Sequence, residues 1–401
     1  MTRRGTILLI LLLIFFPGKV LAGENVPCPV GEAAVLMDAR NGQVLYGKNM
    51  HKQMYPASTT KILTAILALE KGHLDELVAI PKDACQVEGT SLGLRAGEQL
   101  TLRDLLYALL MASANDVAVA IADHMAGSVA NFAGLMNEKA KSLGATDSHF
   151  TNPHGLPDPD HYSSAYDLAL IARYAMQNTT FREIVKTRFK VISRQLQGPL
   201  QEQLWNHNRL LERYRGAIGI KTGYTVEAGQ CLVASAQRNG RELIAVVLKS
   251  QGEAIYEDAE KLLDYGFNNF LPVEVVKKGE RITSAEVSGG ELEKVDLLSG
   301  SDFWYDLPQR DPPNLSRRLQ LAREIQAPLS KGQKVGKLDV YAGEQKVGTV
   351  DLVTAYAVGR KSTKTWLFWL AGAALLVLGG IIQEILVFRY FEWVTSLLNN
   401  K

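Results

Sequence analysis

A serine and a lysine three residues apart form the first candidate reactive pair in the sequence. Ser58 opens a predicted helix over residues 59–70, and Lys61 lies one turn further along it. Because side chains three residues apart share a helix face, the Lys61 amine can reach the Ser58 hydroxyl. A serine hydroxyl needs a base to become a strong nucleophile, and a lysine with a lowered pKa can be that base. Backbone N–H groups at the helix N-terminus can stabilise a developing oxyanion.

A second motif supplies a hydroxyl and an amide on a short loop. Ser113-Ala114-Asn115 falls between two predicted helices, over residues 101–111 and 115–125. Ser113 can relay a proton from this position, and Asn115 can hold a substrate amide. Serine and asparagine are common in ordinary loops, so the motif has meaning only in combination with others.

A third motif lies on a predicted strand. Lys221-Thr222-Gly223 is followed by Tyr224, and its lysine and threonine can bind a carboxylate. A glycine on a strand lets another backbone lie close, and we expect that backbone to be the substrate. Each motif alone also fits an ordinary cap, loop or turn, since S-x-x-K occurs on the order of once by chance in such a chain. Together, in elements that suit them, the three motifs predict one active site.

The elements that must position these motifs indicate an α+β domain. Hydrophobic runs predict a central mixed sheet with an inserted helical cluster and a closing helix. Thr101 and Asp104 form a capping-box pattern at one helix start. The expected strands cover residues 33–37, 43–46, 189–193, 231–237 and 243–248, and the expected helices cover residues 59–70, 101–111, 115–125, 132–143, 163–177 and 254–270.

The two ends of the chain carry apolar segments of different kinds. The start has Arg3 and Arg4 before an apolar run over residues 7–16, which predicts a signal peptide. Residues 366–382 are uncharged, and as a helix they would reach about 25 Å, close to the minimum for a membrane crossing. Residues 385–398 are amphipathic. The tail therefore either crosses the membrane or lies in its interface.

These features divide the chain into four expected regions. They are a signal peptide at 1–22, a catalytic domain at 23–270, a small all-β domain at 271–360 and a membrane anchor at 361–401. Because a signal peptide exports what precedes the anchor, we expect the catalytic domain on the extracytoplasmic side of the cell membrane. The β-rich region contains no obvious catalytic cluster, which favours a spacer or adaptor role.

Composition argues against several other classes of function. The net charge is +2, and the first 22 residues contribute +3, so the remainder carries −1 and is a poor match for nucleic acid. Cys28, Cys85 and Cys231 allow at most one disulfide and lack metal-ligand spacing. No H-E-x-x-H pattern occurs, so we expect neither a metal nor another cofactor.

In this order, the three motifs resemble those of the penicillin-binding protein and serine β-lactamase superfamily. The leader, the β-rich region and the apolar tail are similar to those of low-molecular-mass D-alanyl-D-alanine carboxypeptidases. The resemblance implies a β-lactamase/transpeptidase-like fold and removal of the terminal D-alanine from peptidoglycan stem peptides. It also implies covalent binding of β-lactam antibiotics and contact of the tail with membrane lipid. Further segments that resemble the family are residues 88–94, 152–156, 161–167 and 208–211.

The resemblance implies chemical roles for four of the motif residues. Ser58 is then the acylated nucleophile, and Lys61 is its general base. Ser113 and Lys221 pass a proton to the leaving D-alanine.

The resemblance also implies how the substrate is held. Asn115 binds the substrate amide, and the Lys221-Thr222-Gly223 strand holds the terminal carboxylate through its lysine and threonine. The N–H groups of Ser58 and Tyr224 form the oxyanion hole. Many members carry an arginine at the end of the strand that follows, where this chain has Leu248-Lys249-Ser250, so the grip on the carboxylate differs.

Alternatives to this interpretation remain at the level of sequence. Residues 89–93 match G-x-S-x-G literally, but an α/β-hydrolase nucleophile elbow needs a helix next, and a loop is predicted there. A Ser-His-Asp triad would have to use His154 and Asp167, which we expect instead to shape a loop near the site. A β-lactamase or a DD-endopeptidase is the alternative within the superfamily, and a catalytically silent wall-binding protein is the alternative outside enzymes.

Overall fold

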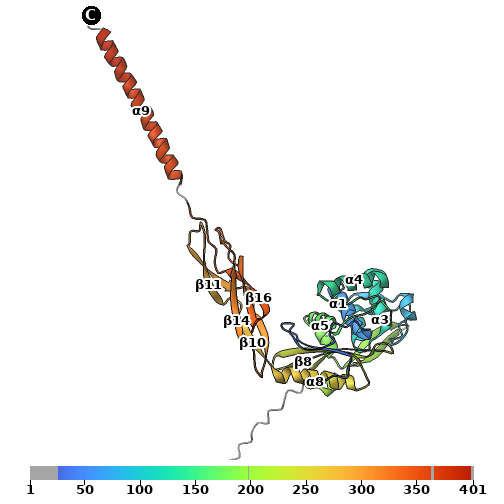
Figure 1. The fold of residues 1–401 in the computed structure, drawn as a ribbon. Helices are drawn as coiled ribbons and strands as arrows, with labels where there is room; N and C mark the ends of the chain where they lie inside the picture. The colour runs from blue at the N-terminus through green and yellow to red at the C-terminus, as the bar shows by residue number, and fades with distance from the viewer. Residues whose placement is uncertain (1–25, 197, 363–364, 399–401) are drawn as a thin grey trace, which may run out of the picture. The chain divides into compact units, whose positions relative to one another are not determined.

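The computed structural model of the protein describes residues 26–196, 198–362 and 365–398. The predicted signal peptide lies outside these residues. The chain forms two compact units, shown together in Figure 1. The first unit contains the described residues up to Val273 together with Tyr305–Pro312, and the second contains Glu274–Trp304 and the residues from Pro313 onward. All three chemical motifs lie in the first unit.

Five strands form the central sheet of the first unit, in the order β2-β1-β9-β8-β7. The pairings between neighbouring strands are all antiparallel, so the prediction of a mixed sheet was wrong. The predicted α+β class is confirmed, because helices pack on this antiparallel sheet. Strand β7, which carries the Lys221 motif, lies at the edge of this sheet. The strands are β1 (Ala33–Asp38), β2 (Val44–Lys48), β7 (Ala217–Thr225), β8 (Gly229–Arg238) and β9 (Arg241–Ser250).

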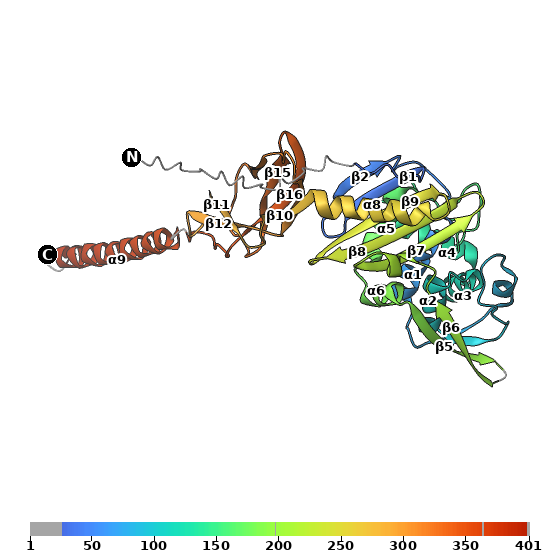
Figure 2. The same ribbon diagram turned by 90° about the horizontal axis from the view of Figure 1, so that it is seen from below.

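The central sheet is buried on both faces because helices cover both. Along β9, Val246 and Leu248 point into one hydrophobic cluster, whereas Ala245 and Val247 point into another. Helix α8 (Ala254–Asn269) packs along β8 and β9 on the second face, as Figure 2 shows. Strands covered on both faces are expected to be apolar throughout. The resulting packed layers give the motifs a rigid base.

The helical cluster on the first face supplies the nucleophile and the loop motif. The helix expected over residues 59–70 begins as a 3-10 turn, η1 (Ala57–Thr60), and continues as α1 (Lys61–Lys71). Thr101 caps α2 as expected, since its hydroxyl accepts a hydrogen bond of 3.1 Å from the Asp104 N–H. The other helices of the unit are η2 (Lys82–Gln86), α2 (Leu102–Met111), α3 (Asn115–Ala126), α4 (Val129–Ser142), α5 (Ala165–Ala175), α6 (Thr179–Lys186) and α7 (Leu210–Arg213).

A separate four-stranded sheet contains the strand that we expected in the central sheet at residues 189–193. That prediction was wrong because β5 pairs along its length with β6, and the hairpin satisfies its hydrogen bonds locally. Its side chains alternate between exposed Val191 and buried Ile192, the pattern of a strand with one face in water. In sheet order the strands are β3 (Leu77–Ala79), β4 (Gln99–Thr101), β5 (Phe189–Leu196) and β6 (Gly198–Trp205).

The second unit is built mainly from short strands, as the β-rich pattern predicted. Its five-stranded sheet has the order β11-β12-β16-β15-β14, while β10 and β13, whose residues are divided between the two units, form a two-stranded sheet. A small hydrophobic cluster that includes Val295, Leu297 and Val358 forms the core. The strands are β10 (Phe270–Val276), β11 (Arg281–Glu286), β12 (Lys294–Ser299), β13 (Phe303–Pro308), β14 (Leu315–Leu321), β15 (Lys334–Ala342) and β16 (Gln345–Thr354).

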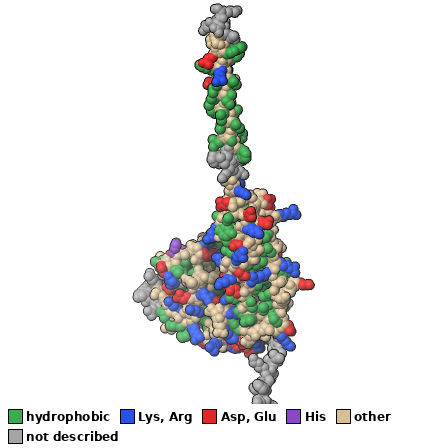
Figure 3. Space-filling view, turned by 90° about the vertical axis from the view of Figure 1, so that its left-hand side faces the viewer, with side chains coloured by type: hydrophobic (Ala, Val, Ile, Leu, Met, Phe, Trp, Pro, Cys, Tyr) green, Lys and Arg blue, Asp and Glu red, His purple; other side chains and the backbone are tan. Residues whose placement is uncertain are grey.

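A long helix, α9 (Thr365–Leu398), ends the described chain. The segments at 366–382 and 385–398, which we distinguished by their polarity, belong to this one helix. Its stretch Phe368–Ser396 has a mean hydropathy of 2.1 and is long and apolar enough to cross a membrane. Hydrophobic side chains, shown in green, occur along the visible face of α9 in Figure 3. The residues in the most apolar part of this helix are not buried against the rest of the protein.

Candidate active site

Close backbone contacts hold the segment that carries Ser58, the candidate nucleophile. Ala57, immediately before Ser58, has a φ of +46°, a conformation that costs energy for a residue with a side chain. A Cβ built at Gly155 would lie 1.8 Å from the Ala57 carbonyl oxygen, and one built at Gly223 would lie 2.8 Å from the Ser58 nitrogen. The loop at Gly155 and strand β7 at Gly223 therefore both contact the segment that carries Ser58, and each contact requires a glycine.

The role of Gly223 differs in one respect from the expectation. We expected this glycine to make room for a substrate backbone. It makes room first for the enzyme's own nucleophile segment, since the Ala57 Cβ and the Thr59 nitrogen would each lie 3.1 Å from an added Cβ. Strand β7 and the turn η1 can approach each other only because this position has no side chain.

Lys61 is fully buried and lies beside the Ser58 hydroxyl, as the spacing of the motif predicted. Its Nζ is 2.9 Å from Ser58 Oγ, 2.7 Å from Asn115 Oδ1 and 2.8 Å from the His154 carbonyl oxygen. All three partners are neutral oxygens, and among the described residues the amine has no carboxylate partner. The structure thus brings the first and second motifs together around one amine.

Burial lowers the pKa of Lys61 well below its usual value, because the ammonium form loses its hydration. The nearby positive charge of Lys221 lowers this pKa further, while the charge of Asp116 opposes the shift. The neutral amine has two N–H donors and one lone pair. If the donors go to Asn115 and His154, the lone pair faces the Ser58 hydroxyl, which is the geometry of a general base.

Ser113 sits on the loop between α2 and α3 with its backbone in the left-handed region, at a φ of +63°. The residue is 6% exposed, and its hydroxyl forms no hydrogen bond with another described residue. This hydroxyl is not one of the fully buried polar atoms without a partner, so water or a ligand can contact it.

Asn115, at the start of α3, is fixed from both sides. Its Oδ1 accepts from Lys61, while its Nδ2 donates to the Glu88 carbonyl oxygen at 2.7 Å and its backbone N–H donates to the Thr90 carbonyl oxygen at 2.7 Å. The segment at 88–94, which resembled the family, thus forms the support of this asparagine. Because Nδ2 is already bonded, the orientation of the amide is set before substrate arrives.

Lys221 is the second buried lysine of the site. Burial lowers its pKa to about 7, and its Nζ donates to the Thr222 carbonyl oxygen at 2.9 Å. The charge of Lys221 also lowers the pKa of His207, after the larger effect of burial, so His207 lies near this part of the site. A lysine that titrates near neutral pH can both attract a carboxylate and pass on a proton.

Tyr224 directly follows the Lys221-Thr222-Gly223 motif on β7. The residue is 60% exposed, and its backbone pairs with Gln230 of β8. Since β7 is an edge strand, its other side can pair with an extended peptide. Thr222 and Thr225 on the same strand are partly exposed.

Two groups that support the site were not identified from the sequence. The carboxylate of Asp116 accepts hydrogen bonds from the Ser91 hydroxyl at 2.6 Å and from the N–H groups of Leu92 and Leu94. His161 Nδ1 accepts from the Thr151 N–H, so in the neutral ring its Nε2 donates to the Thr60 hydroxyl at 2.9 Å. Their only signal in the sequence was their place in or beside segments that resembled the family.

The structure does not support the competing nucleophiles. Ser91 lies in a loop that no helix follows directly, and its hydroxyl donates to Asp116 rather than to a histidine. His154 Nδ1 accepts from the Leu156 N–H, and burial lowers the pKa of this histidine to about 3. Asp167 instead accepts bonds from the Asp147 N–H and the Ser148 hydroxyl. The expectation that His154 and Asp167 shape loops near the site agrees with these contacts.

The cysteines are free, and the described residues contain no group of three or more His, Cys, Asp or Glu side chains placed to hold a metal ion. Cys231 on β8 lies under the nucleophile segment, with its Sγ 3.8 Å from the Tyr55 carbonyl oxygen and its residue 1% exposed. Burial raises the pKa of its thiol to about 11. Cys28 and Cys85 are exposed.

Comparison with known proteins gives consistent matches over nearly the whole chain. The sequence profile described as D-alanyl-D-alanine carboxypeptidase matches residues 25–252, and that of the penicillin-binding protein 5 C-terminal domain matches residues 270–360. The chain is 34% identical over 381 residues to D-alanyl-D-alanine carboxypeptidase DacD of Escherichia coli, covering 90% of this chain and 96% of the relative.

Solved structures show the same relationship. Penicillin-binding protein 5 from Haemophilus influenzae aligns with a TM-score of 0.74 and 30% identity, over 83% of this chain and 99% of that one. Penicillin-binding protein 6B from Escherichia coli aligns with a TM-score of 0.63 and 31% identity, over 82% and 96%. The fold and the site thus define a serine peptidase of the penicillin-binding protein class. The chain belongs to the D-alanyl-D-alanine carboxypeptidase family, and the resemblance inferred from the motifs is confirmed.

Proposed function

We propose that the protein removes the terminal D-alanine from peptidoglycan stem pentapeptides through an acyl-enzyme on Ser58, and that β-lactam antibiotics acylate the same hydroxyl. The observation that carries the proposal is the fully buried amine of Lys61, 2.9 Å from Ser58 Oγ and surrounded by neutral oxygens. Membership of a carboxypeptidase family supports the reaction type.

Acylation follows from this geometry. Neutral Lys61 takes the proton of Ser58 as Oγ attacks the carbonyl carbon of the penultimate D-alanine, and the N–H groups of Ser58 and Tyr224 stabilise the oxyanion. The tetrahedral intermediate collapses by breaking the C–N bond. The proton that Lys61 took then passes by way of Ser113 and Lys221 to the leaving amine, so D-alanine departs as a neutral amine and Lys61 is again unprotonated when water enters.

Deacylation reverses the proton path with water as the nucleophile. A water molecule gives its proton to Lys61 as it attacks the ester carbonyl. The ester bond to Ser58 Oγ then breaks, and Oγ takes a proton back from Lys61. The products are the shortened peptide acid and the free enzyme, and the same step on a β-lactam adduct would open the site again.

Binding of the substrate uses the edge strand and the fixed amide. Lys221 and Thr222 bind the terminal carboxylate, Asn115 binds the substrate amide, and Gly223 keeps the strand against the nucleophile. In place of the arginine that many members carry, Lys249 of this chain forms an ion pair of 3.0 Å with Glu32. The grip on the carboxylate therefore depends mainly on Lys221 and Thr222.

We also propose the placement of the enzyme in the cell. Residues 1–22 export the chain, residues 23–270 form the catalytic domain, residues 271–360 form the all-β domain, and residues 361–401 anchor it to the membrane. The apolar and exposed helix α9 supports the anchor, and the leader sequence supports an extracytoplasmic catalytic domain. The substrate and the active site then lie in the same compartment.

A labelling experiment tests the chemistry directly. The full-length protein in detergent is treated with a labelled penicillin, digested and analysed by mass spectrometry, and D-alanine release from a D-alanyl-D-alanine peptide is measured in parallel. We expect the label on Ser58 and release of one D-alanine per peptide. A label on Ser91, with a Ser58→Ala variant still active, would overturn the proposal.

A further inference from the structure

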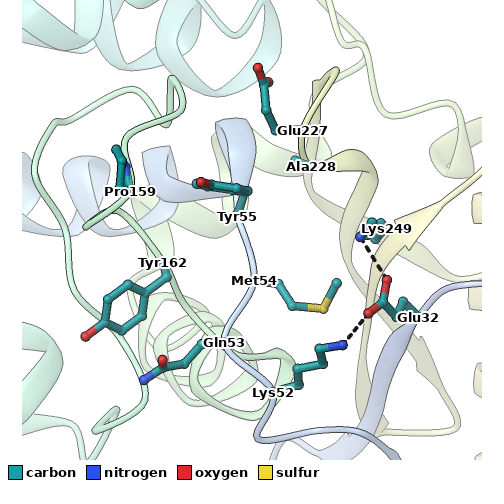
Figure 4. Close-up of a pocket in the computed structure, with 10 residues that line it drawn as sticks. All are labelled: Glu32, Lys52, Gln53, Met54, Tyr55, Pro159, Tyr162, Glu227, Ala228 and Lys249. Atoms are coloured by element: carbon teal, nitrogen blue, oxygen red, sulfur yellow. Dashed lines mark hydrogen bonds and ion pairs between the residues drawn. The ribbon is translucent and has the colours of Figure 1, made fainter.

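A pocket at one end of the central sheet takes no part in the reaction described above. It has a volume of about 360 Å³ and lies between the loops at residues 52–55 and 159–162, the turn from β7 to β8, and the end of β9. Met54, Tyr55 and Tyr162 give it an apolar and aromatic side, which Figure 4 shows opposite the end of β9. The pocket opens beside the segment that leads to Ser58.

Two lysines and one glutamate form the other side of this pocket. Glu32 Oε1 is 2.5 Å from Lys52 Nζ, and Glu32 Oε2 is 3.0 Å from Lys249 Nζ; Figure 4 shows both lysines converging on the one carboxylate. These three side chains carry a net charge of +1. Each ammonium has three N–H donors and uses one on Glu32, so donors remain for a ligand. We call this group the Lys52–Glu32–Lys249 cluster.

The cluster contributes little to the fold. The side chains of Lys52 and Lys249 are 54% and 51% exposed, and ion pairs at such exposure add little to stability. With Glu227, the other acidic residue, the lining contains two lysines and two glutamates and is neutral overall. Glu227 is exposed on the turn from β7 to β8, and Figure 4 shows it apart from both lysines, so the positive charge is confined to the side that the cluster forms. A partly open, positively charged side facing aromatic rings has the chemistry of an anion-binding subsite.

The pocket lies in the direction in which the substrate chain leaves the nucleophile. Under the proposed function, the terminal carboxylate is at Lys221 and the reacting carbonyl is at Ser58, so the preceding residues run along β7 past Tyr224. Strand β7 ends at Thr225, and the turn that follows it contributes Glu227 and Ala228 to the pocket. A chain that runs along β7 past Tyr224 therefore reaches the mouth of the pocket, where a side chain on the residue before the D-alanyl pair can enter it.

We propose that this pocket is a subsite for a free carboxylate borne by the stem-peptide residues that precede the D-alanyl pair. The carboxylate accepts hydrogen bonds from Lys52 and Lys249, and the methylene groups beside it pack on Tyr55 and Tyr162. This proposal rests on the proposed function, and it adds a specificity: the enzyme prefers stem peptides whose carboxylate is free over those in which it is amidated.

Two matched peptides test the subsite with the full-length protein in detergent. Both end in D-alanyl-D-alanine, and they differ only in a free carboxylate or a carboxamide on the residue before the pair. The readout is the ratio of kcat/KM for D-alanine release from the two. We expect the wild type to prefer the free carboxylate about fivefold, the factor that corresponds to one exposed charge contact. The Lys52→Met/Lys249→Met double variant should bring the ratio close to one.

A Glu32→Gln variant separates binding from structure. It removes the same two ion pairs as the double lysine variant but leaves both ammonium groups, so the net charge of the cluster rises to +2. The ratio should therefore rise above that of the wild type, whereas a purely structural role predicts a change in the same direction for both variants. Lys71→Met/Lys141→Met alters two exposed lysines elsewhere by the same total charge and should leave the ratio unchanged.

The outcomes distinguish the subsite from the reaction. If D-alanine is released but the wild type does not discriminate between the peptides, or the double lysine variant keeps the full preference, the subsite proposal is wrong and the proposed function stands. If neither peptide releases D-alanine, the proposed function fails, and the subsite fails with it.

Discussion

Replacing Lys61 by arginine tests the proton path of the proposed mechanism. Arginine brings a permanent positive charge in place of the neutral amine, and it can still donate to Asn115 Oδ1 and the His154 carbonyl oxygen, the two fixed acceptors around the amine. It cannot give up its proton at any accessible pH. The variant therefore removes the base while leaving hydrogen-bond partners for both acceptors.

The expected size of the effect follows from the role assigned to the amine. Loss of a general base slows a reaction by about 10²–10⁴-fold, so acylation of Ser58 by penicillin should fall at least about a hundredfold. That is about 2.7 kcal/mol of transition-state stabilisation. The wild-type rate should also fall as pH decreases, because protonation of Lys61, whose pKa lies well below its usual value, removes the lone pair.

The assay compares two lysine-to-arginine variants. Acylation rates are measured with a fluorescent penicillin, and thermal melts establish that each variant is folded. Lys221→Arg keeps a cation for the carboxylate and leaves the base intact, so it should retain more acylation than Lys61→Arg. A folded Lys61→Arg variant that acylates at nearly the wild-type rate would refute the role of this amine, and the proton would then have to leave through Ser113 and Lys221.

Three further predictions concern the strand motif and the tail. Gly223→Ala places a Cβ 2.8 Å from the Ser58 nitrogen. Thermal melts should show that the free energy of unfolding falls by about 1–3 kcal/mol, and acylation of Ser58 should slow. The control Gly134→Ala, whose Cβ would lie in open space on α4, should leave stability unchanged or raise it. Lys221 has a pKa of about 7 when folded and about 10.4 when unfolded. The unfolded chain thus binds more protons between these values, and stability rises with pH there; Lys221→Met should flatten the Tm–pH curve, and an unchanged curve would contradict the low pKa. Truncation before Trp366 should release a soluble, penicillin-binding enzyme in a sedimentation assay, and pelleting with membranes would disprove the anchor.

The reactive pair could be predicted because helical spacing alone brings Ser58 and Lys61 together. The order of the three motifs then predicted that Asn115 would join them, and it accepts from Lys61 at 2.7 Å. The strands at 231–237 and 243–248 were recognised because continuous apolar runs mark burial on both faces. Local patterns were sufficient wherever the contact is local or the burial is complete.

Contacts between distant segments were not predictable in the same way. The backbone carbonyl of His154 accepts a hydrogen bond from Lys61, 93 residues away in the sequence. Because every residue has a backbone oxygen, this contact does not depend on the residue type and cannot be recognised from the sequence. The strand at 189–193 was assigned to the wrong sheet because its partner depends on a hairpin whose second strand has few apolar residues. Gly223 was recognised as necessary, but only the structure places Ser58 against it.

The buried thiol of Cys231 offers a way to observe motion beneath the nucleophile. Cys231 pairs with Gly223 in the sheet and lies under the Tyr55 carbonyl, so a reagent can reach it only when the sheet and the nucleophile segment separate. With its pKa raised to about 11, it stays protonated and slow to react at neutral pH even when briefly exposed. The rate of Cys231 alkylation, compared with the rates at exposed Cys28 and Cys85, therefore reports how often the sheet and the nucleophile segment separate. A covalently bound β-lactam that contacts both should lower the rate of Cys231 alkylation.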